Sequence, residues 1–315
     1  MAYRVLIPQD ISDGGKNYLK ERGYDITVHG KNGQIDLETV GEYDAILLRT
    51  AIVDRKVLDA AGKLKVIGRY GVGTDNIDLE ACREKGISVT NAPYGNILSV
   101  VEYTMLMLLQ CAKNTHEVEQ LWRCPENDFN TRNTHCGVEL AGKCLGIVGT
   151  GRIGSLVAKK AKYGFDMEII GYDPYLSEQK QSPDVTYCSS LHDLLKIADF
   201  VTCHVPLNEE TYHLIGEAEF RLMKSTAFLI NASRGGVIDE EALHKALIEK
   251  KIAGAALDVF EHEPKVWPNP LFELPNVVVS PHTAGMTKES SDRVGIHAAM
   301  GIDAVLSGRM PEWTV

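Results

Sequence analysis

The sequence predicts an α/β protein built from two doubly wound parallel sheets. Short runs of apolar and β-branched residues alternate with longer helical patterns, as expected of parallel strands joined by crossover helices. The alternation occurs in two series along the chain. At 315 residues, 44% of them hydrophobic, the chain is long enough for two domains with full cores. We therefore expect two α/β units.

The first series predicts the strands of an N-terminal unit. Its apolar runs, which begin with "YRVLIP", occupy residues 3–8, 24–29, 43–50, 64–71 and 86–93. The most apolar segment of the chain follows at 97–113, but it carries Glu102 and Gln110 and is too short and too polar to span a bilayer. We expect a largely buried helix there, with a partner chain as one way of covering it. Residues 117–143 show no clear periodicity, so we expect them to form a connection.

The second series predicts a further, larger sheet. Its apolar runs occupy residues 143–151, 167–173, 200–206, 226–233, 252–260 and 277–282. Residues 287–315 are helical in pattern and then stop, so we expect no further domain after them. The N-terminal apolar run is far too short for a signal peptide and meets Asp10 at once, so we predict no targeting segment and a cytoplasmic protein.

The charge and the cysteines exclude several functional classes. The formal net charge of -10 argues against a nucleic-acid or anionic-membrane partner, because such surfaces attract basic proteins. If the substrate is anionic, the positive charge that binds it must be local. The seven cysteines are scattered and contain no Cys-x-x-Cys pair or Cys/His ligand spacing. We expect reduced, mostly structural thiols and no metal site.

A glycine-rich turn in the second series predicts a dinucleotide site. The segment "GIVGTGRIG" places Gly149, Gly151 and Gly154 in a G-x-G-x-x-G pattern between an apolar strand and a helix, which is the context that the motif requires. Gly149 permits the tight turn, Gly151 lets the backbone approach a pyrophosphate, and Gly154 lets the helix pack closely on the strand. The helix N-terminus then holds the anion. The alternative is a glycine-rich turn without a ligand.

The next strand of this series ends in an acidic residue. The acid that binds the adenosine ribose is expected ~20 residues after the last glycine of the motif. Asp173 lies close to that distance after Gly154. A carboxylate there accepts a hydrogen bond from the 2'-hydroxyl group and repels a 2'-phosphate. The sequence therefore favours NAD over NADP.

Charged residues follow three later strands of the second series. Arg234 follows "TAFLINAS", Asp258, Glu261 and Glu263 follow "AGAAL", and His282 follows "VVVSP". Ligands of open parallel sheets bind outside the carboxyl ends of the strands, so these residues are candidates for one site. Each has a structural alternative: a surface ion pair for the arginine, a solvated loop for the acids, and a loop position for the histidine.

Together these residue types supply the chemistry of alcohol oxidation. Hydride transfer from a hydroxyl-bearing carbon to nicotinamide needs a base for the hydroxyl proton, and histidine, with a usual pKa of about 6.5, suits that role. A carboxylate beside an imidazolium stabilises it and orients the ring. An arginine can bind a substrate carboxylate in bidentate fashion and polarise the adjacent carbonyl.

Motifs along nearly the whole chain resemble those of the D-isomer-specific 2-hydroxyacid dehydrogenases. The matching segments are "RYGVGTDNIDLEACREKGISVTNAP", "GNILSVVEYT", "LGIVGTGRIG", "YDP", "CHVPLNEET", "LINASRGGVIDEEAL", "AGAALDVFEHEP" and "PHTAG". The resemblance implies that Arg234 binds the substrate, that His282 is the acid/base and that Glu263 is its carboxylate partner. Because the family pattern places this acid just before the proline of "EHEP", Glu263 is favoured over Glu261.

The resemblance also implies further cofactor contacts. It assigns Asp258 to the nicotinamide carboxamide. Backbone or packing contacts with NAD are implied for Arg152, Ile153, Val205, Ala232 and Gly285.

The family fold implies a domain order that the two series alone do not show. A Rossmann NAD domain, residues 98–286, is expected to be inserted into a flavodoxin-like substrate domain made of residues 1–97 and 287–315, with the active site in the cleft. The resemblance also implies a two-fold homodimer through the NAD domain, which fits the apolar excess of 97–113.

The substrate is expected to be a small anionic 2-hydroxy or 2-keto acid. Backbone N–H groups near Val72 and Gly73 could hold its carboxylate. Arg49 and Arg69 end two strands of the first series and match positions that bind the phosphate in family members that oxidise 3-phosphoglycerate. The alternative is that both are ordinary surface arginines, because hydroxypyruvate and glyoxylate reductases use the same scaffold. The segment "LWRCPENDFN" is longer and more polar than in common relatives.

Two other functions are compatible with the sequence. C-terminal binding protein corepressors keep this fold, the NAD loop and the Arg, Glu and His residues, yet they are NAD-sensing interaction proteins. They carry long disordered extensions that this chain lacks. A reductase of branched or aromatic 2-keto acids would need an apolar pocket in place of Arg49 and Arg69, so the sequence favours it least. We also expect no serine regulation through a C-terminal domain.

Overall fold

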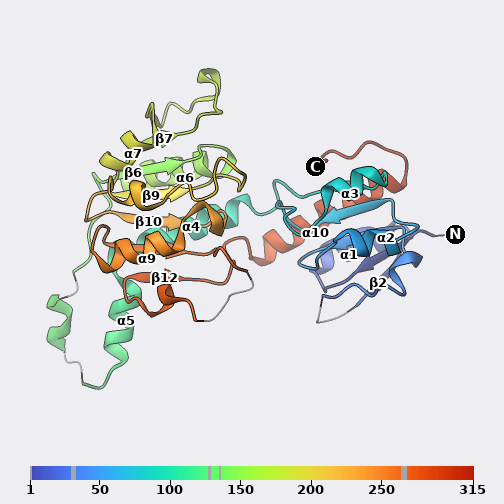
Figure 1. Cartoon of the computed structure of the whole chain (residues 1–315), viewed down its shortest axis with the longest axis horizontal. Helices are drawn as coiled ribbons and strands as arrows, with labels where there is room; N and C mark the ends of the chain where they lie inside the picture. The colour runs from blue at the N-terminus through green and yellow to red at the C-terminus, as the bar shows by residue number, and fades with distance from the viewer. Residues whose placement is uncertain (1, 30–32, 127–128, 135, 264–267) are drawn as a thin grey trace. The chain divides into compact units, whose positions relative to one another are not determined.

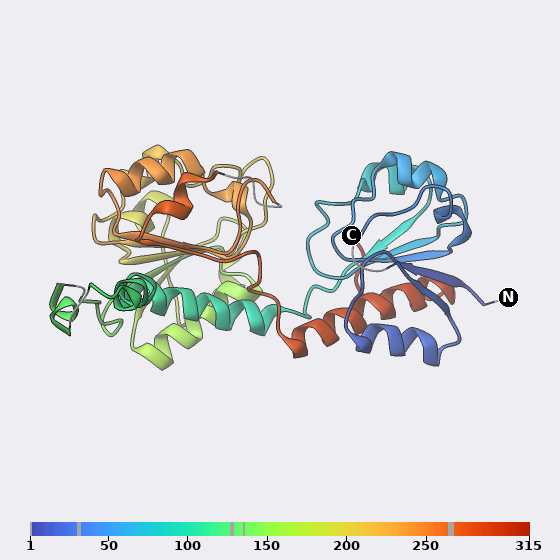
Figure 2. The ribbon, with the colours of Figure 1, turned by 90° about the horizontal axis from the view of Figure 1, so that it is seen from below.

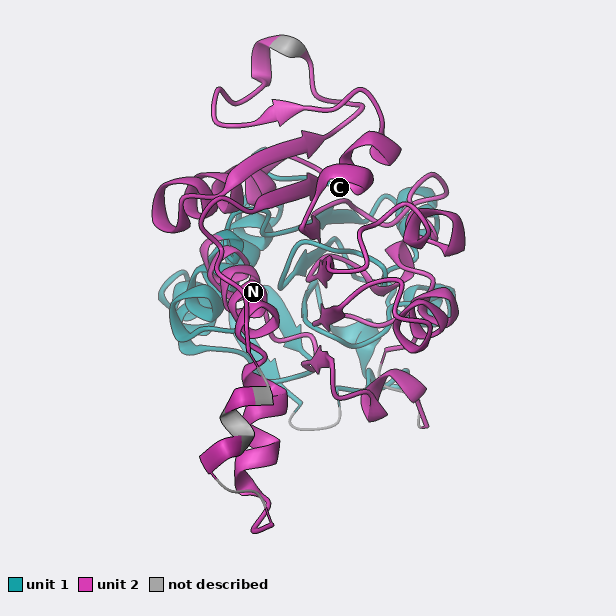
Figure 3. Ribbon diagram, turned by 90° about the vertical axis from the view of Figure 1, so that its left-hand side faces the viewer, with its two compact units in different colours: residues 1–97, 285–315 teal, residues 98–284 magenta. Residues whose placement is uncertain are grey.

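The chain divides into two compact units, each built on a parallel sheet (Figures 1 and 3). The computed structural model describes residues 2–29, 33–126, 129–134, 136–263 and 268–315. Unit 1 comprises residues 1–97 and 285–315, and unit 2 comprises residues 98–284. Among the described residues the sheets have five and seven strands, and every strand pair is parallel. The predicted α/β class with two parallel sheets is confirmed.

The sheet of unit 1 has the strand order β2-β1-β3-β4-β5, which is the flavodoxin-like order. The chain crosses to the other side of β1 after β2, so the sheet is wound in both directions. All four residues of β3 are buried, as expected for a strand covered on both faces. The strands, each within a predicted run, are β1 (Arg4–Ile7), β2 (Asp25–Val28), β3 (Ala45–Leu48), β4 (Val66–Arg69) and β5 (Ser88–Thr90).

Helices cover both faces of this sheet. The helices are α1 (Asp13–Glu21), η1 (Val40–Glu42), α2 (Arg55–Ala60), α3 (Leu79–Glu84) and α10 (Lys288–Leu306). Figure 2 shows α1 and α10 together on one face. They pack closely because Gly15 carries no side chain: a Cβ there would lie 2.6 Å from the carbonyl oxygen of Gly295. Ala298 and Ile302 of α10 belong to the core, so the returning C-terminal segment is an integral part of unit 1.

The sheet of unit 2 has the strand order β12-β11-β10-β9-β6-β7-β8. Counted from β6, this is the Rossmann order with one added strand at the end. The strands are β6 (Cys144–Val148), β7 (Glu168–Tyr172), β8 (Thr186–Tyr187), β9 (Phe200–Cys203), β10 (Phe228–Asn231), β11 (Gly254–Leu257) and β12 (Val277–Val279). Of these strands only β8 lies outside the predicted runs, because two residues are too few to show a periodicity.

The helices of unit 2 also lie on both faces. They are α4 (Ile97–Lys113), α5 (Thr115–Arg123), η2 (Phe129–Thr134), α6 (Arg152–Phe165), η3 (Glu178–Lys180), α7 (Leu191–Ile197), α8 (Glu217–Phe220), η4 (Gly235–Val237), α9 (Glu240–Ile248) and η5 (Pro270–Glu273). Leu195, Phe220 and Leu243 bring α7, α8 and α9 into the core. Figure 2 shows α4 and α6 on the opposite face. Among the described residues, no helix has the length and apolarity that a membrane crossing requires.

Residues 117–143 were predicted to form a connection. That prediction is wrong for the residues up to 134, which include helices. They contain most of α5 and all of η2. No described residue of α5 is buried. Val118, Leu121 and Trp122 share one face of α5 through their i, i+3 and i+4 spacing. One such apolar stripe in a polar segment is a weak signal, which is why the sequence did not reveal the helix.

Candidate functional site

The predicted site residues of unit 2 follow the carboxyl ends of its parallel strands. Strand β6 pairs with β7 on one side and with β9 on the other. The chain therefore changes direction across the sheet at β6, and open α/β sheets bind ligands at such a switch point. The glycine loop leaves β6 at this position and leads into α6.

Two of the three glycines are required by the packing of the protein itself. Gly149 has φ +87, and a Cβ there would lie 2.8 Å from the carbonyl oxygen of His204. A Cβ at Gly154 would lie 2.1 Å from the carbonyl oxygen of Gly149. A Cβ at Gly151, in contrast, would meet no heavy atom within 4 Å. The space beside Gly151 is therefore open, as the approach of a diphosphate to the backbone requires.

The N-terminus of α6 offers backbone donors to an anion. The helix begins at Arg152, with Gly151 as its N-cap, and no side chain caps it. The first-turn N–H groups, among them that of Ile153, have no intrahelical partners. The helix dipole adds partial positive charge at the same place. The loop and the helix start together fit the diphosphate of a dinucleotide.

Asp173 stands beside this loop, just after β7. Its Oδ2 accepts a hydrogen bond from the backbone N–H of Thr150 at 3.0 Å, and its Oδ1 accepts one from that of Tyr175 at 3.2 Å. These bonds fix the carboxylate next to the glycine loop. A carboxylate has about four acceptor sites, so both oxygens can also accept from ribose hydroxyl groups.

The other predicted NAD contacts are distributed over both units. A Cβ on Gly149 would lie 2.8 Å from Cγ1 of Val205, so Val205 contacts the glycine loop. Ala232 directly follows β10 at the same edge of the sheet. Gly285 belongs to unit 1, where a Cβ on it would lie 3.1 Å from Nδ2 of Asn96.

One residue beside the glycine loop was not predicted. His204 directly follows β9, and its Nε2 lies 3.0 Å from Oγ1 of Thr202. Burial lowers the pKa of His204 to about 4, so its imidazole is neutral at pH 7. Its position in "CHVP", at the end of a buried strand of the same sheet, was the only available signal.

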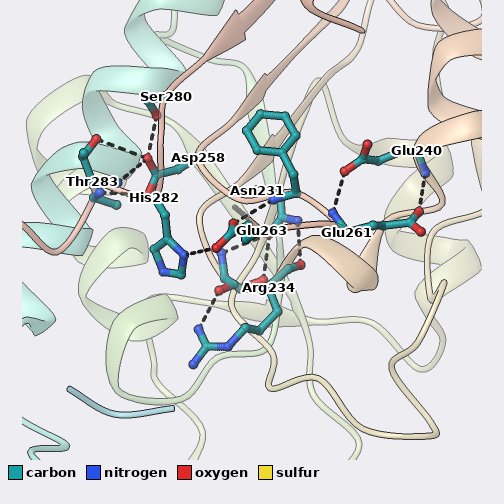
Figure 4. Close-up of polar contacts among 12 residues, drawn as sticks. Asn231, Arg234, Glu240, Asp258, Glu261, Glu263, Ser280, His282 and Thr283 are labelled. Carbon is teal, nitrogen blue, oxygen red and sulfur yellow. Dashed lines mark hydrogen bonds and ion pairs between the residues drawn. The ribbon is translucent and has the colours of Figure 1, made fainter. Parts of the chain in front are cut away.

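His282 and Glu263 form a close pair at the ends of the neighbouring strands (Figure 4). Nδ1 of His282 lies 2.6 Å from Oε2 of Glu263, and the backbone N–H of Phe260 donates to Oε1 of Glu263 at 3.0 Å. The contact through Nδ1 leaves Nε2 as the ring nitrogen that can exchange a proton with a ligand. The His282 side chain is 51% exposed, so a ligand can reach it. Glu261 lies in a different set of contacts, with Glu240.

The Glu263 carboxylate is held in its ionised form. Partial burial alone would raise the pKa of Glu263, but the hydrogen bond and charge of His282 act in the opposite direction. The N–H of Phe260 and the charge of Arg234 also lower the pKa, which ends below the usual glutamate value. At neutral pH this carboxylate is therefore a hydrogen-bond acceptor for His282.

Asp258 fixes the loop that carries His282. Its side chain is fully buried. Oδ1 accepts from Oγ of Ser280 at 2.6 Å and from the N–H of Thr283 at 2.8 Å, and Oδ2 accepts from the N–H of Ala284 at 2.8 Å. The Asp258 carbonyl accepts from the N–H of His282 at 2.7 Å. These contacts on both sides hold His282 at φ +53, which non-glycine residues rarely adopt. The predicted contact of Asp258 with the nicotinamide carboxamide stays a prediction.

Arg234 leaves β10 in a turn that Asn231 organises. Asn231 is fully buried; its Oδ1 accepts from the N–H and Oγ of Ser233, at 3.0 and 2.7 Å, and its Nδ2 donates to the carbonyl of Arg234 at 2.9 Å. A Cβ on Gly235 would lie 1.9 Å from the carbonyl carbon of Phe260. The Arg234 turn and the Glu263 loop are therefore packed directly together. Asn231 was not predicted; only its place at the end of β10 marked it.

The predicted substrate residues of unit 1 lie at one edge of its sheet. Leu48 pairs with Arg69, so Arg49 directly follows β3 and Arg69 ends the neighbouring strand β4. Arg69 is turned back onto its own loop: Nε donates to the carbonyl of Gly73 at 2.7 Å, and Nη1 donates to the carbonyl of Tyr70. The Arg49 guanidinium lies 5.9 Å from the ring centre of Tyr70.

The loop after β4 is fixed through its carbonyl groups. Asn91 Nδ2 donates to the carbonyl of Val72 at 3.0 Å, in addition to the contact between Arg69 and Gly73. The Val72 residue is 39% exposed. The structure thus places Val72 and Gly73 beside Arg69 in one ordered loop.

The fold and the site define a dinucleotide-binding α/β protein. Residues 105–284 match the family model described as "D-isomer specific 2-hydroxyacid dehydrogenase, NAD binding domain". A D-3-phosphoglycerate dehydrogenase of Methanocaldococcus jannaschii is 43% identical over 311 residues, which cover 98% of this chain and 58% of the relative. A glyoxylate reductase of Thermococcus litoralis is 40% identical over 320 residues, which cover 99% of this chain and 96% of the relative.

A crystal structure of a protein from Thermus thermophilus shares the fold, with a TM-score of 0.90 and 34% identity over 99% of both chains. The chain belongs to the D-isomer-specific 2-hydroxyacid dehydrogenase family, and its residues 105–284 correspond to the NAD-binding domain of that family. It spans little more than half, 58%, of the length of the M. jannaschii relative.

Proposed function

We propose that this protein interconverts a D-2-hydroxy acid and its 2-keto acid with NAD, and that 3-phosphoglycerate and 3-phosphohydroxypyruvate are its preferred pair. The observation that carries the proposal is the 2.6 Å contact between Nδ1 of His282 and Oε2 of Glu263. It occurs at the carboxyl edge of the sheet that also bears the glycine loop. An imidazole that is bound to a carboxylate through one nitrogen is suited to exchange protons through the other.

The residues divide the work of the reaction. Bound NAD supplies the hydride acceptor for oxidation and, once reduced, the hydride donor for the reverse direction. Nε2 of His282 removes the proton of the substrate hydroxyl group during oxidation and returns it to the carbonyl oxygen during reduction. The ionised Glu263 stabilises the imidazolium. Arg234 binds the substrate carboxylate and polarises the adjacent carbonyl group.

The cofactor preference is carried by Asp173. Its carboxylate, held beside the glycine loop by the N–H of Thr150, would accept from the ribose 2'-hydroxyl group and repel a 2'-phosphate. NADH should therefore give a higher kcat/KM than NADPH. Asp173→Ser should reduce that preference; equal rates with both cofactors in the native protein would contradict it.

The substrate preference rests on the arginines of unit 1. Arg49 and Arg69 lie at one sheet edge, and two cations there suit a phosphate group. The alternative is a hydroxypyruvate or glyoxylate reductase, and the T. litoralis relative, named a glyoxylate reductase, supports it at 40% identity. The phosphoglycerate dehydrogenase relative stands at 43%, so relatedness alone does not separate the two.

Initial rates of NADH oxidation test both the proposed reaction and the proposed substrate preference. The substrates are 3-phosphohydroxypyruvate, hydroxypyruvate, glyoxylate and 2-ketoisocaproate. We expect the phosphorylated substrate to give the highest kcat/KM, and Arg49→Ala to remove that advantage. A lead for glyoxylate or hydroxypyruvate that Arg49→Ala leaves unchanged would identify a small-acid reductase. No turnover together with tight NADH binding would favour an NAD-sensing interaction protein.

The homodimer is proposed to form through the NAD domain. Helix α4 exposes Leu98 and Leu106 at 52% and 45%, and α5 exposes Trp122 at 63%. Exposed apolar side chains on neighbouring helices are typical of a surface that another chain covers. Light scattering should give the mass of two chains, and Leu106→Glu should shift it toward one chain. A monomeric native protein would contradict this part of the proposal.

A further inference from the structure

The loop that carries Glu263 is fastened by a reciprocal pair of acidic residues. The backbone N–H of Glu240 donates to Oε1 of Glu261 at 2.9 Å, and the backbone N–H of Glu261 donates to Oε1 of Glu240 at 2.6 Å. The other oxygen of Glu240 accepts from Nδ2 of Asn269 at 2.9 Å. Figure 4 shows this pair on the side of the loop away from His282.

The position of the pair explains why two carboxylates tolerate each other here. Glu240 is the first residue of α9, so its N–H has no partner within the helix and the helix dipole favours a negative charge beside it. Nε2 of His213 lies 3.2 Å from Oε1 of Glu261 and adds a further polar contact. Each carboxylate is thus bound by a backbone N–H of the other residue, and the pair joins the start of α9 to the 260–263 loop.

A continuous set of contacts connects this pair to His282. The backbone N–H of Glu261 donates to the side chain of Glu240. The carbonyl group of Phe260 packs against Gly235, where a Cβ would lie 1.9 Å from the carbonyl carbon of Phe260. The N–H of Phe260 in turn donates to Oε1 of Glu263 at 3.0 Å. The other oxygen of Glu263 meets His282 at 2.6 Å. Movement of the backbone on either side of Phe260 would therefore move the carboxylate that orients the imidazole.

We propose that Glu240 and Glu261 are positioning residues, which hold the 260–263 loop so that the Glu263 carboxylate meets Nδ1 of His282. They contact neither the histidine nor the reacting atoms, and they act through the loop backbone. The inference rests on the proposed function, because its main readout is turnover.

Substitutions at Glu261 separate a positioning role from a merely structural one. Glu261→Ala removes the acceptor for the Glu240 N–H, and we expect a fall in kcat of about tenfold, since small displacements of catalytic groups are costly. The KM for NADH should stay within about twofold, because the glycine loop makes none of these contacts. Glu261→Gln keeps an acceptor oxygen and should retain kcat within about threefold. Glu241→Ala, an exposed neighbour on α9, is the matched control and should change neither constant.

A double-mutant cycle with Glu263→Gln tests whether Glu261 acts through Glu263. If Glu261 acts through Glu263, Glu261→Ala should cost less than about twofold further in the Glu263→Gln background. A full tenfold loss in that background would overturn the positioning role. So would a Gln variant as slow as the Ala variant, or an unchanged kcat in folded Glu261→Ala, with folding checked by thermal unfolding. A native protein without turnover on any 2-keto acid would overturn the proposed function and this inference together; additivity in an active protein overturns only the inference.

Discussion

His282, at the carboxyl edge of the sheet of unit 2, and Arg49, at that of unit 1, differ in how firmly they are held. In unit 2, buried Asp258 accepts three hydrogen bonds shorter than 3 Å from the loop around His282, and buried Asn231 organises the turn of Arg234. In unit 1, the Arg49 guanidinium is placed by the ring of Tyr70 and by Sδ of Met286, 3.9 Å from its Nη2. Soft contacts of this kind fix an orientation far less than a buried hydrogen-bond network does.

This difference suggests a division of labour between the units. Acid–base chemistry requires groups held within a fraction of an ångström, which a dense network provides. Selection among small acids requires only a suitable charge, which a less constrained arginine can supply. Changes in the loops of unit 2 should therefore affect turnover of every substrate, and changes at Arg49 should affect one substrate class. The following experiments test that contrast.

The largest effect is expected from His282→Ala. Loss of the proposed acid/base group should reduce kcat about 10³-fold with every 2-keto acid, since general acid–base catalysis contributes ~10²–10⁴-fold. NADH affinity, measured by fluorescence titration, should stay within about threefold because the glycine loop is intact. A variant that loses activity with only one substrate would remove His282 from the shared chemistry.

Asp258 should matter most for stability. Asp258→Ala leaves the N–H groups of Thr283 and Ala284 without their buried acceptor, so we expect a loss of about 3 kcal/mol in the free energy of unfolding. Urea unfolding measures this loss. Asp25→Ala is the control, because Asp25 is exposed and water screens its ion pair with Arg4 at 3.7 Å, so that variant should unfold much as the native protein does. Equal losses in the two variants would contradict the network.

In unit 2, the positions of the charged residues were easier to derive from sequence than the contacts that hold them. Parallel strands bring their carboxyl ends to one edge, so the positions of Arg234 and His282 followed from the strand pattern. The orientation of Asp258 did not, because its partners lie more than twenty residues away and depend on how the chain returns after β12. Sequence spacing cannot show which donors a buried carboxylate will meet.

The same limit applies to the arginines and to α5. Arg69 was predicted at a strand end, where it lies, but its hydrogen bonds to the carbonyls of Tyr70 and Gly73 depend on the shape of the following loop. Helix α5 escaped prediction because its apolar face consists of few residues and is not buried in the chain. The preference for Glu263 over Glu261 came from the family resemblance, and the structure places Glu263 against His282.

The two arginines should differ in effect. Arg49→Ala should lower kcat/KM about 30-fold with 3-phosphohydroxypyruvate and less than threefold with glyoxylate, as loss of a charged hydrogen bond costs about 2 kcal/mol. Arg69→Ala should lower kcat/KM with both substrates, because it also releases the loop that contains Gly73. Steady-state kinetics on both substrates measures this split. Equal effects of Arg49→Ala on both substrates would contradict a role in substrate selection.

The Glu263 carboxylate that contacts His282 should stay ionised to a lower pH than an ordinary glutamate. The folded-state pKa of Glu263 is lowered, so its stabilising contribution is present above the unfolded value of about 4.3 and is lost only as the pH falls through the lower folded value. Carbon-13 NMR of the glutamate carboxyl groups, with Glu263 assigned by the missing signal in Glu263→Gln, should give a midpoint below about 4.3 in the native protein. A midpoint above that value would mean that burial outweighs His282, and the carboxylate would no longer be held ionised.

The smallest effect is expected in the reactivity of the cysteine thiols. The reactivity of one buried cysteine in each unit allows the cores of the two units to be compared. Cys124 and Cys136 are exposed. The only cysteine of unit 1, Cys82, is buried with its pKa raised to about 11, and burial raises the pKa of Cys203 in the core of unit 2 to about 12.

At pH 8 the thiolate fraction of a group with pKa 12 is roughly 10³-fold below that of an ordinary cysteine, and access is restricted as well. Labelling with a thiol reagent, followed by mass spectrometry, should therefore modify Cys124 and Cys136 first and leave Cys82 and Cys203 until urea is added. The urea concentrations at which Cys82 and Cys203 become reactive then report the opening of unit 1 and unit 2 separately. If Cys203 became reactive first, the dense network of unit 2 would fix the loops of Arg234 and His282 without making the whole unit more stable, and the contrast would be confined to the sheet edge.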